Sequence, residues 1–335
     1  MQAKVIRFES KGQAVLADFE LRAPGPGEVL IENEFSAVSA GTERANLLGL
    51  PNTCTTDGFP FIPGYSAVGR VAAVGDGVEG LQLGDLVVNN WSGHRSHAVK
   101  KASGLVKVAA GVQPLEASFA VIASFAFLGV RKLRVEIGES VMVAGLGILG
   151  VFAVQIAGRC GGQPVLAADF DPKRRELASR LGVDLALSPD DPDFKQKVMA
   201  VTDGKGVNAV VEVTGAAAAL QQALEYIAFG GRVSLLGCTR VSDAPIDYYK
   251  YVHRRGITMV GSHTHTRPLV ESAPGQWTEQ DDYRTFMKLV AAKKLHVLPV
   301  ISEIASPAEA PAVYARLAEA SQPPLGIVFD WRTLR

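Results

Sequence analysis

The sequence of 335 residues is poor in cysteine, in surplus charge and in long apolar runs. Its three cysteines, Cys54, Cys160 and Cys238, are widely spaced and odd in number, so a disulfide framework is not expected. The 34 basic and 34 acidic residues cancel, which leaves no basic field to attract nucleic acid or an anionic membrane. No apolar run approaches the roughly 20 residues of a membrane span, and the first residues resemble a strand rather than a signal peptide. We therefore expect a cytoplasmic protein without nucleic-acid or membrane partners.

Two kinds of pattern divide the chain. Residues 1 to about 110 contain short β-branched runs bounded by glycine and proline turns, which predicts a mainly β region. From Pro114 onward the pattern changes, and strands such as 140–144 alternate with helices such as 148–160. This alternation is typical of an α/β fold with a doubly wound parallel sheet, as in the Rossmann fold.

The sequence after His263 becomes polar and then contains a predicted helix at 280–293 and a predicted strand at 326–329. The simplest interpretation is that this tail returns to the first domain. We therefore expect a discontinuous β-rich domain with a nucleotide-binding domain inserted in it. Their expected residues are 1–122 with 264–335, and 123–263.

A glycine-rich turn, Gly145-Leu146-Gly147-Ile148-Leu149-Gly150, follows the predicted strand 140–144 and opens a helix. This context favours a dinucleotide-binding loop over an ordinary turn. Gly145 permits a tight turn, Gly147 lets backbone N–H groups approach a pyrophosphate, and Gly150 lets the helix lie close to the strand. The helix N-terminus adds unpaired donors and partial positive charge.

Asp169 ends the next strand, nineteen residues after Gly150. A carboxylate there accepts the ribose hydroxyls of NAD and repels the 2′-phosphate of NADP, so NAD is the expected cofactor. The cluster Lys173-Arg174-Arg175 could host a phosphate, but a solvated helix face is the preferred interpretation. Later strands end in small or polar residues. These either let the backbone run close to the nicotinamide ribose or form ordinary turns. The predicted cofactor contacts are Gly145, Gly147, Ile148, Leu149, Gly150, Asp169, Thr214, Gly237 and Cys238.

These stretches together resemble the medium-chain dehydrogenase/reductase superfamily, the zinc alcohol dehydrogenase-like proteins, over nearly the whole chain. The resemblance implies a GroES-like β-rich catalytic domain, a Rossmann domain and a homodimer joined through the last Rossmann strand, here 257–260. A weaker similarity points to the bacteriochlorophyllide dehydrogenase-like branch. The residues that carry the resemblance are Pro63-Gly64-Tyr65-Ser66 with Gly69, then Gly75, Gly84-Asp85, the loop at Gly145, and Gly230-Gly231 with Leu236-Gly237.

The departures from the family pattern concern the metal. The first catalytic zinc ligand, a Cys, falls on Ala40, the His ligand falls on Tyr65, and the third ligand falls near Ala123. Alanine cannot coordinate zinc, and tyrosine is a poor substitute for histidine. The four cysteines of the structural zinc lobe are missing between Leu86 and Pro114. We therefore expect a zinc-lacking member of the family.

Without zinc, hydrogen-bond donors must stabilise the charge that develops on the substrate oxygen. Tyr65 is the best candidate because it occupies a lost ligand position and carries a hydroxyl proton. Its alternative is an ordinary tyrosine with a satisfied hydroxyl. Thr42 matches the relay hydroxyl of the family, and its alternative is a turn or cap hydroxyl. Glu43 could orient a neighbour, but a simple surface or ion-pair role is preferred.

Histidines form the other group of candidates, because imidazole titrates near neutrality. His94 and His263 are the two that we predict as catalytic, although a hydrogen-bonded structural histidine is the more common case. Arg267 could bind an anionic or polyol group, but a surface ion pair is preferred. Trp91, with Phe125 and Phe127, could line an apolar pocket, although phenylalanines at helical spacing are more often core.

The sequence therefore predicts an NAD(H)-dependent, zinc-independent oxidoreductase that transfers a hydride between nicotinamide and a small alcohol or carbonyl substrate. One alternative is an NAD(P)H-dependent reductase of enones or quinones, whose C=C chemistry needs less stabilisation of oxygen. A second alternative is a nicotinamide-binding protein without turnover. The sequence leaves the substrate, the direction and the stereochemistry of the reaction open.

Overall fold

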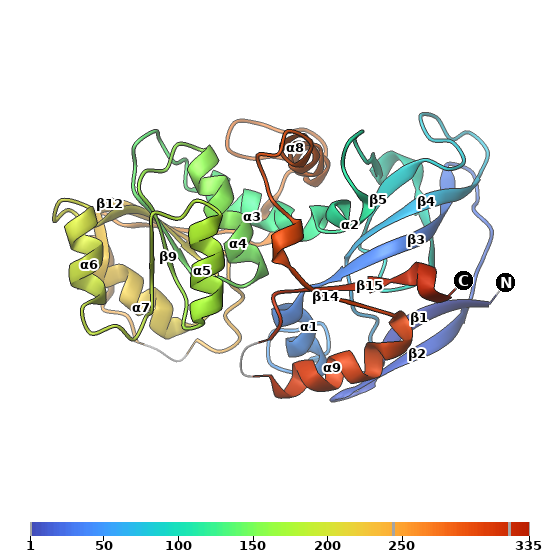
Figure 1. The fold of residues 1–335 in the computed structure, drawn as a ribbon, viewed down its shortest axis with the longest axis horizontal. Coiled ribbons are helices and arrows are strands. Elements are labelled where there is room, and N and C mark those ends of the chain that lie inside the picture. The colour runs from blue at the N-terminus through green and yellow to red at the C-terminus, as the bar shows by residue number, and fades with distance from the viewer. Residues whose placement is uncertain (1, 243–244, 321–322, 335) are drawn as a thin grey trace. The chain divides into compact units, whose positions relative to one another are not determined.

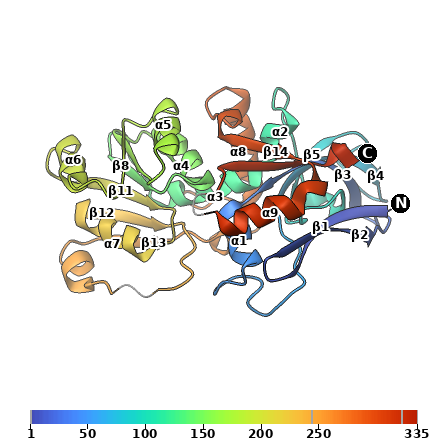
Figure 2. The same ribbon diagram turned by 60° about the horizontal axis from the view of Figure 1, so that its bottom comes forward.

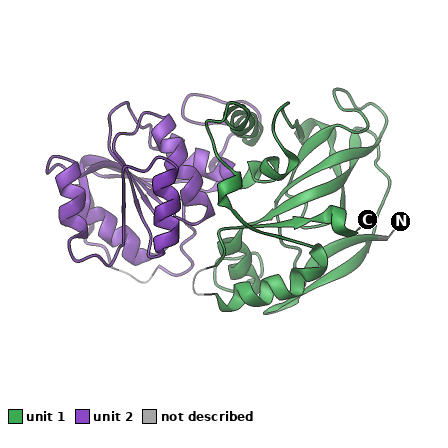
Figure 3. Ribbon diagram, in the orientation of Figure 1, with its two compact units in different colours: residues 1–122, 279–335 green, residues 123–278 purple. Residues whose placement is uncertain are grey.

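The computed structural model describes residues 2–242, 245–320 and 323–334 (Figure 1). The chain forms two compact units, which are described separately (Figure 3). Unit 1 consists of Met1–Ile122 and Glu279–Arg335, and unit 2 consists of Ala123–Thr278. No helix among the described residues is long and apolar enough to span a membrane.

Unit 2 is built on a parallel sheet of six strands in the order β10-β9-β8-β11-β12-β13. Because the first strand of this sheet lies inside it and later strands are added on both sides, the predicted doubly wound fold is confirmed. The strands β8 and β9 are buried along their whole length, as expected for a sheet covered on both faces. The strands are β8 (Val141–Ala144), β9 (Val165–Ala168), β10 (Leu185–Leu187), β11 (Val207–Glu212), β12 (Ile227–Leu235) and β13 (Thr258–Gly261).

Helices cover both faces of this sheet, with α4 and α5 on one face and α7 on the other (Figure 2). The start of α5 shows why the chain becomes helical there. Asp171 caps it by accepting a hydrogen bond from the Lys173 backbone N–H at 2.8 Å, and Pro172 occupies the first helical position. The helices are α3 (Ala120–Lys132), which begins in unit 1, α4 (Ile148–Arg159), α5 (Pro172–Arg180), α6 (Phe194–Val201) and α7 (Ala217–Tyr226).

The parallel register brings four strand ends to one edge of the sheet. Ala144 pairs with Ala168 and with Glu212, and Glu212 pairs with Leu235. The turns that follow these strands therefore lie side by side at the carboxyl edge, which is where open α/β sheets bind their ligands.

Unit 1 contains a mainly antiparallel sheet in the order β14-β15-β3-β4-β5-β7, and β6 also pairs with β3. The predicted β-rich domain is therefore confirmed. Its strands are β3 (Glu28–Val38), β4 (Ser66–Val74), β5 (Leu86–Asn90), β6 (His97–Lys101), β7 (Val106–Lys107), β14 (Ile301–Ala305) and β15 (Gly326–Asp330), beside the hairpin β1 (Gln2–Ser10) and β2 (Gln13–Glu20). The helices of this unit are α1 (Ala40–Leu47), α2 (Pro114–Ala117), α8 (Glu279–Ala291) and α9 (Ala310–Glu319).

The register of this sheet positions two of the candidate residues. Ala37 at the end of β3 pairs with Ser66 at the start of β4, and Ser66 pairs in turn with Asn90 at the end of β5. The start of α1, which follows β3, and Tyr65, which precedes β4, therefore lie at the same edge of the sheet.

The second domain boundary differs from the sequence prediction. The units divide at 278/279 rather than at 263/264, because the segment 264–278 packs against α3 of unit 2. The Lys132 ammonium donates to the Thr266 hydroxyl at 2.6 Å, and the Arg131 guanidinium lies 3.9 Å from the centre of the Trp277 ring. The polar composition after His263 marks a loop, but it carries no information on which unit that loop contacts.

Candidate active site

The turn after β8 gives its three glycines different roles. Gly145 has a φ of 99°, a left-handed conformation that favours glycine. A Cβ on Gly150 would lie 1.9 Å from the carbonyl oxygen of Gly145, so only glycine lets the first turn of α4 pack on the loop. A Cβ on Gly147 would meet no atom within 4 Å. The local backbone and packing therefore explain the glycines at positions 145 and 150. They do not explain Gly147, which lies beside open space.

That open space lies beside the N-terminus of α4, which begins at Ile148. Gly147 is the N-cap of α4, and no side chain caps this helix. The first backbone N–H groups of a helix have no partner within it and carry partial positive charge. The N–H groups at Ile148 and Leu149 are therefore suited to hold the diphosphate of a nicotinamide dinucleotide.

Asp169 lies at the neighbouring strand end, as predicted, and its carboxylate is already oriented. It accepts hydrogen bonds from the backbone N–H of Leu146 at 2.7 Å and of Asp171 at 2.9 Å. The Arg174 guanidinium lies 3.8 Å from the same carboxylate. The interpretation of this basic cluster as a solvated face is wrong for Arg174, whose side chain is only 16% exposed, and for Arg175, which donates to the Asp169 carbonyl at 2.7 Å.

Glu212, at the end of β11, is a buried carboxylate to which sequence analysis gave no role. It accepts hydrogen bonds from the backbone N–H of Thr214 at 2.8 Å and of Gly215 at 3.1 Å, and burial raises its pKa. The Thr214 hydroxyl donates to the same carboxylate. A Cβ on Gly237 would lie 2.2 Å from the Gly215 nitrogen, so the two turns pack closely, with Cys238 exposed beside them. Thr214 thus has the turn role that we kept as an alternative.

In unit 1, Tyr65 forms part of an aromatic pair. It is half-buried, and its ring centre lies 5.2 Å from that of Trp91. The backbone N–H of Trp91 donates to the Tyr65 carbonyl at 2.9 Å. Trp91 is 46% exposed and has a φ of 53°, an unusual conformation for a bulky residue. The two aromatic rings therefore lie together at the edge of the sheet.

A carboxylate accompanies this pair. Glu279, the first residue of α8, accepts a hydrogen bond from the Trp91 indole at 3.0 Å and from the Tyr283 hydroxyl at 3.0 Å. Nearby, the Lys100 ammonium donates to the Asn90 carbonyl at 2.8 Å, and burial lowers the pKa of Lys100. The aromatic pair is therefore fixed by polar contacts that sequence analysis did not find, because Glu279 lies far away in the sequence.

Thr42 lies in the first turn of α1, at the sheet edge where Tyr65 also lies, and is half-buried. Its carbonyl accepts a hydrogen bond from the Asn46 side chain at 2.8 Å. Glu43, the next residue, is buried and accepts a hydrogen bond from the Ser39 backbone N–H at 2.8 Å. The first turn of α1 is therefore held rigidly.

The two predicted histidines lie in different surroundings. His94 is completely buried, a position that does not favour direct contact with a substrate. His263 is exposed and accepts a hydrogen bond from the His265 backbone N–H at 3.3 Å. Partial desolvation of its ring, together with the neighbouring His265, lowers its pKa. Arg267 is buried rather than in a surface ion pair, and its guanidinium donates to the Ser124 carbonyl.

The donor set for a metal is poor. Within the described residues, no group of three or more histidine, cysteine, aspartate or glutamate side chains could hold a metal ion. Ala40 is buried in α1, and Ala123 is buried in α3. Neither methyl group can bind zinc, so the residues at the family's ligand positions do not fit this ion.

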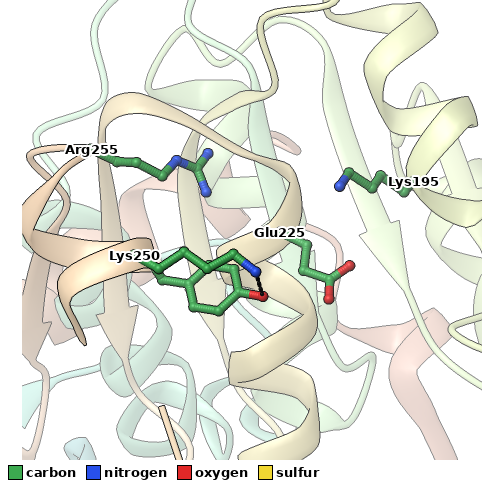
Figure 4. A pocket seen from close by; sticks show the side chains of 5 residues that line it. Lys195, Glu225, Lys250 and Arg255 are labelled. Atoms are coloured by element: carbon green, nitrogen blue, oxygen red, sulfur yellow. Dashed lines mark hydrogen bonds between the residues drawn. The ribbon is translucent and has the colours of Figure 1, made fainter. Parts of the chain in front are cut away.

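Unit 2 also contains a surface pocket of about 310 Å³ on the side of α6 and α7 (Figure 4). The Lys250 ammonium donates to the Tyr251 hydroxyl at 3.2 Å, and the Arg255 guanidinium donates to the carbonyls of Leu224 and Ile227 at the end of α7. None of the predicted site residues lines this pocket, whose lining residues are Lys195, Glu225, Lys250, Tyr251 and Arg255.

Comparison with protein families decides the class. The model for the alcohol dehydrogenase GroES-like domain matches residues 25–153, and the model for zinc-binding dehydrogenases matches residues 149–292. The chain belongs to the medium-chain zinc-binding dehydrogenase superfamily, the alcohol dehydrogenase-like proteins. The predicted superfamily is thereby confirmed, and nicotinamide dinucleotides are the cofactors typical of this family.

The relatives of this dehydrogenase cover almost its whole length. It is 28% identical to L-threonine 3-dehydrogenase of Pyrococcus furiosus over 89% of this chain and 90% of the relative. It is 26% identical to D-guloside 3-dehydrogenase of Escherichia coli K12 over 91% of this chain and 93% of the relative. A short chain alcohol dehydrogenase from Escherichia coli CFT073, solved in complex with NADH, matches with a TM-score of 0.82 at 16% identity over 98% and 99% of the two chains, which supports the fold alone.

Proposed function

We propose that this dehydrogenase is an NAD(H)-dependent oxidoreductase that interconverts an alcohol and a carbonyl compound without zinc. The observation that carries the proposal is the combination of a dinucleotide loop whose Gly147 faces open space with a tyrosine at the position of a zinc ligand. The dinucleotide, when bound, carries the hydride. The protein must then stabilise the substrate oxygen with its own donors.

Tyr65 is the proposed proton donor to that oxygen. Its ring is fixed against Trp91, so the hydroxyl needs little reorientation before it donates. Thr42, at the same edge of the sheet, is proposed to hydrogen-bond the same oxygen or to pass the proton to solvent. Each is a neutral hydroxyl, and two such donors act in the manner of an oxyanion hole. His263 remains a second candidate for proton exchange with solvent because it is exposed.

The proposed substrate is a secondary alcohol with polar neighbouring groups. The names of two relatives, L-threonine 3-dehydrogenase and D-guloside 3-dehydrogenase, both indicate oxidation at a carbon that carries a secondary hydroxyl beside other polar groups. The aromatic face of Tyr65 and Trp91 beside the Glu279 carboxylate supplies apolar contact together with a hydrogen-bond acceptor.

Activity and metal content can be tested on one sample. We expect the purified protein to oxidise secondary alcohols with NAD, to contain well under one zinc atom per chain by elemental analysis, and to keep its activity after treatment with EDTA. Stoichiometric zinc, or activity lost on chelation and restored by zinc, would refute zinc independence. Reduction of enones in preference to ketones would instead favour C=C chemistry. NADH binding without turnover of either alcohols or enones would favour a non-catalytic role.

Cofactor preference depends on two neighbouring side chains. We expect NADH to raise the melting temperature more than NADPH, because the Asp169 carboxylate repels a 2′-phosphate. Asp169→Ala should weaken this preference, because it removes the carboxylate that repels the 2′-phosphate and that lies 3.8 Å from Arg174. The Asp171 carboxylate, 3.7 Å from Arg174, remains in this variant. The double substitution Asp169→Ala with Arg174→Ala is the matched control. In this variant NADPH should raise the melting temperature less than it does in Asp169→Ala alone. A larger shift with NADPH in the unmodified protein would contradict the Asp169 argument.

We also propose that the protein is a homodimer joined through β13, the strand at one end of the six-stranded sheet. An edge strand offers backbone donors and acceptors to a second copy. Placement in the bacteriochlorophyllide dehydrogenase-like branch stays a prediction from the sequence.

A further inference from the structure

A buried polar cluster lies in unit 1 and has no part in the chemistry described so far. Its five side chains are each at most 2% exposed, although they come from β3, α1, the loop after β5, α9 and the C-terminal turn. We call it the His94 cluster, and its members are Ser36, Glu43, His94, Tyr314 and Trp331.

Hydrogen bonds join the members of the cluster into one chain. An indole N–H only donates, so Trp331 donates to the Ser36 hydroxyl oxygen at 2.9 Å. The Ser36 hydroxyl oxygen also lies 2.7 Å from His94 Nδ1. The other ring nitrogen, Nε2, lies 3.0 Å from the Glu43 carboxylate, and because a carboxylate only accepts, Nε2 donates this bond. Both imidazole nitrogens therefore have hydrogen-bond partners.

Tyr314 completes the arrangement at the other side of Glu43. Its hydroxyl donates to the Oε2 atom that also accepts from His94. Burial and the nearby Glu43 charge raise the pKa of Tyr314 well above its usual range, so the tyrosine keeps the proton that it donates. The Glu43 carboxylate therefore accepts hydrogen bonds from both His94 and Tyr314, which together hold it in place.

The cluster contacts the segment that carries Tyr65. A Cβ on Gly64 would lie 2.6 Å from the His94 ring, so the imidazole packs directly on that glycine. The His94 backbone N–H donates to the Pro63 carbonyl at 2.7 Å, and the Gly93 N–H donates to the Gly64 carbonyl at 3.1 Å. At its other end the His94 ring is bonded to Glu43, the residue after Thr42. One imidazole thus connects the neighbours of both proposed donors.

We propose that His94 is a positioning residue, which sets the Tyr65 hydroxyl relative to Thr42 through its contacts with Gly64 and Glu43. This inference rests on the proposed function, in which both hydroxyls act on one substrate oxygen. Geometry of this kind matters for rate because a misplacement of about 1 Å can reduce turnover about 100-fold. It also explains why a fully buried histidine lies beside the donors without touching the substrate.

A double-mutant cycle distinguishes positioning from stability alone. His94→Leu should lower kcat at least about tenfold on a secondary alcohol, with the NADH dissociation constant unchanged, because it removes a support of Tyr65. In the Tyr65→Phe background the same substitution should cause no further loss, because groups that act as a unit are not additive. Losses that multiply would overturn the inference.

Two further variants complete the test. His94→Gln keeps a donor toward Glu43 and should recover part of kcat; should His94→Leu fail to fold, His94→Gln replaces it in the cycle. Val313→Ala, a buried core position in α9 outside the cluster, serves as the stability control and should lower the melting temperature without lowering kcat. Equal kcat losses in Val313→Ala and His94→Leu would show a merely structural role. A Tyr65→Phe enzyme with normal kcat would refute the proposed role of Tyr65 and the positioning inference together, whereas multiplying losses refute the positioning inference alone.

Discussion

Tyr65→Phe is expected to lower kcat by about 10²- to 10⁴-fold, the usual contribution of a positioned general acid. The phenylalanine ring keeps the aromatic contact with Trp91, whose ring centre lies 5.2 Å away. The substitution therefore removes the hydroxyl and keeps the ring. NADH affinity should not change, because the dinucleotide loop belongs to unit 2. The measurement is steady-state kinetics with a secondary alcohol, together with NADH titration by fluorescence.

Trp91→Phe is the matched comparison for this substitution. It keeps an aromatic side chain beside Tyr65 and removes the indole donor to Glu279. We expect a change mainly in KM, because this residue is proposed to contact the substrate rather than to donate a proton. Were Tyr65→Phe to retain full kcat while Trp91→Phe lost it, Tyr65 would not be the donor.

Gly147→Ala should weaken NADH binding, whereas Gly150→Ala, three residues away, should destabilise the fold. A Cβ at position 150 would lie 1.9 Å from the Gly145 carbonyl oxygen, an overlap that costs about 1–3 kcal/mol of folding free energy. Replacing a helical glycine by alanine returns only about 1 kcal/mol. We therefore expect Gly150→Ala to lower the free energy of unfolding, and denaturant titration measures it.

At position 147 the added methyl group meets no protein atom, and a φ of −64° is one that alanine adopts readily. The unfolding free energy should therefore change little. The NADH dissociation constant should rise at least about tenfold, which corresponds to about 1.4 kcal/mol, because the methyl group occupies the space proposed for the diphosphate. Normal NADH affinity in Gly147→Ala would contradict the assignment of this loop as the cofactor site.

Local signals explain what the sequence could predict. The dinucleotide loop is recognisable because strand, glycines and helix follow one another within a few residues, and Asp169 ends the next strand. The doubly wound sheet follows from the regular alternation of strands and helices. These features depend on neighbours in the chain, and the structure places each of them at the carboxyl edge of one sheet.

Features that depend on distant contacts could not be predicted. From the sequence we predicted His94 as catalytic. Nothing in its local sequence shows that Phe329 and Trp331, at the other end of the chain, help to bury it. Glu279 and Tyr283, which orient the aromatic pair, lie in a helix with an ordinary amphipathic pattern. Only the antiparallel pairing of β15 with β3 brings the C-terminal turn to Ser36.

The left-handed backbone at Trp91 lowers the stability of the fold, whereas its side chain has a role beside Tyr65. An L-residue there costs roughly 1–2 kcal/mol relative to glycine, while the indole supplies the aromatic face beside Tyr65. Glycine or asparagine at position 91 would relieve this backbone strain. Either would also remove the ring that packs on Tyr65 and the indole that donates to Glu279.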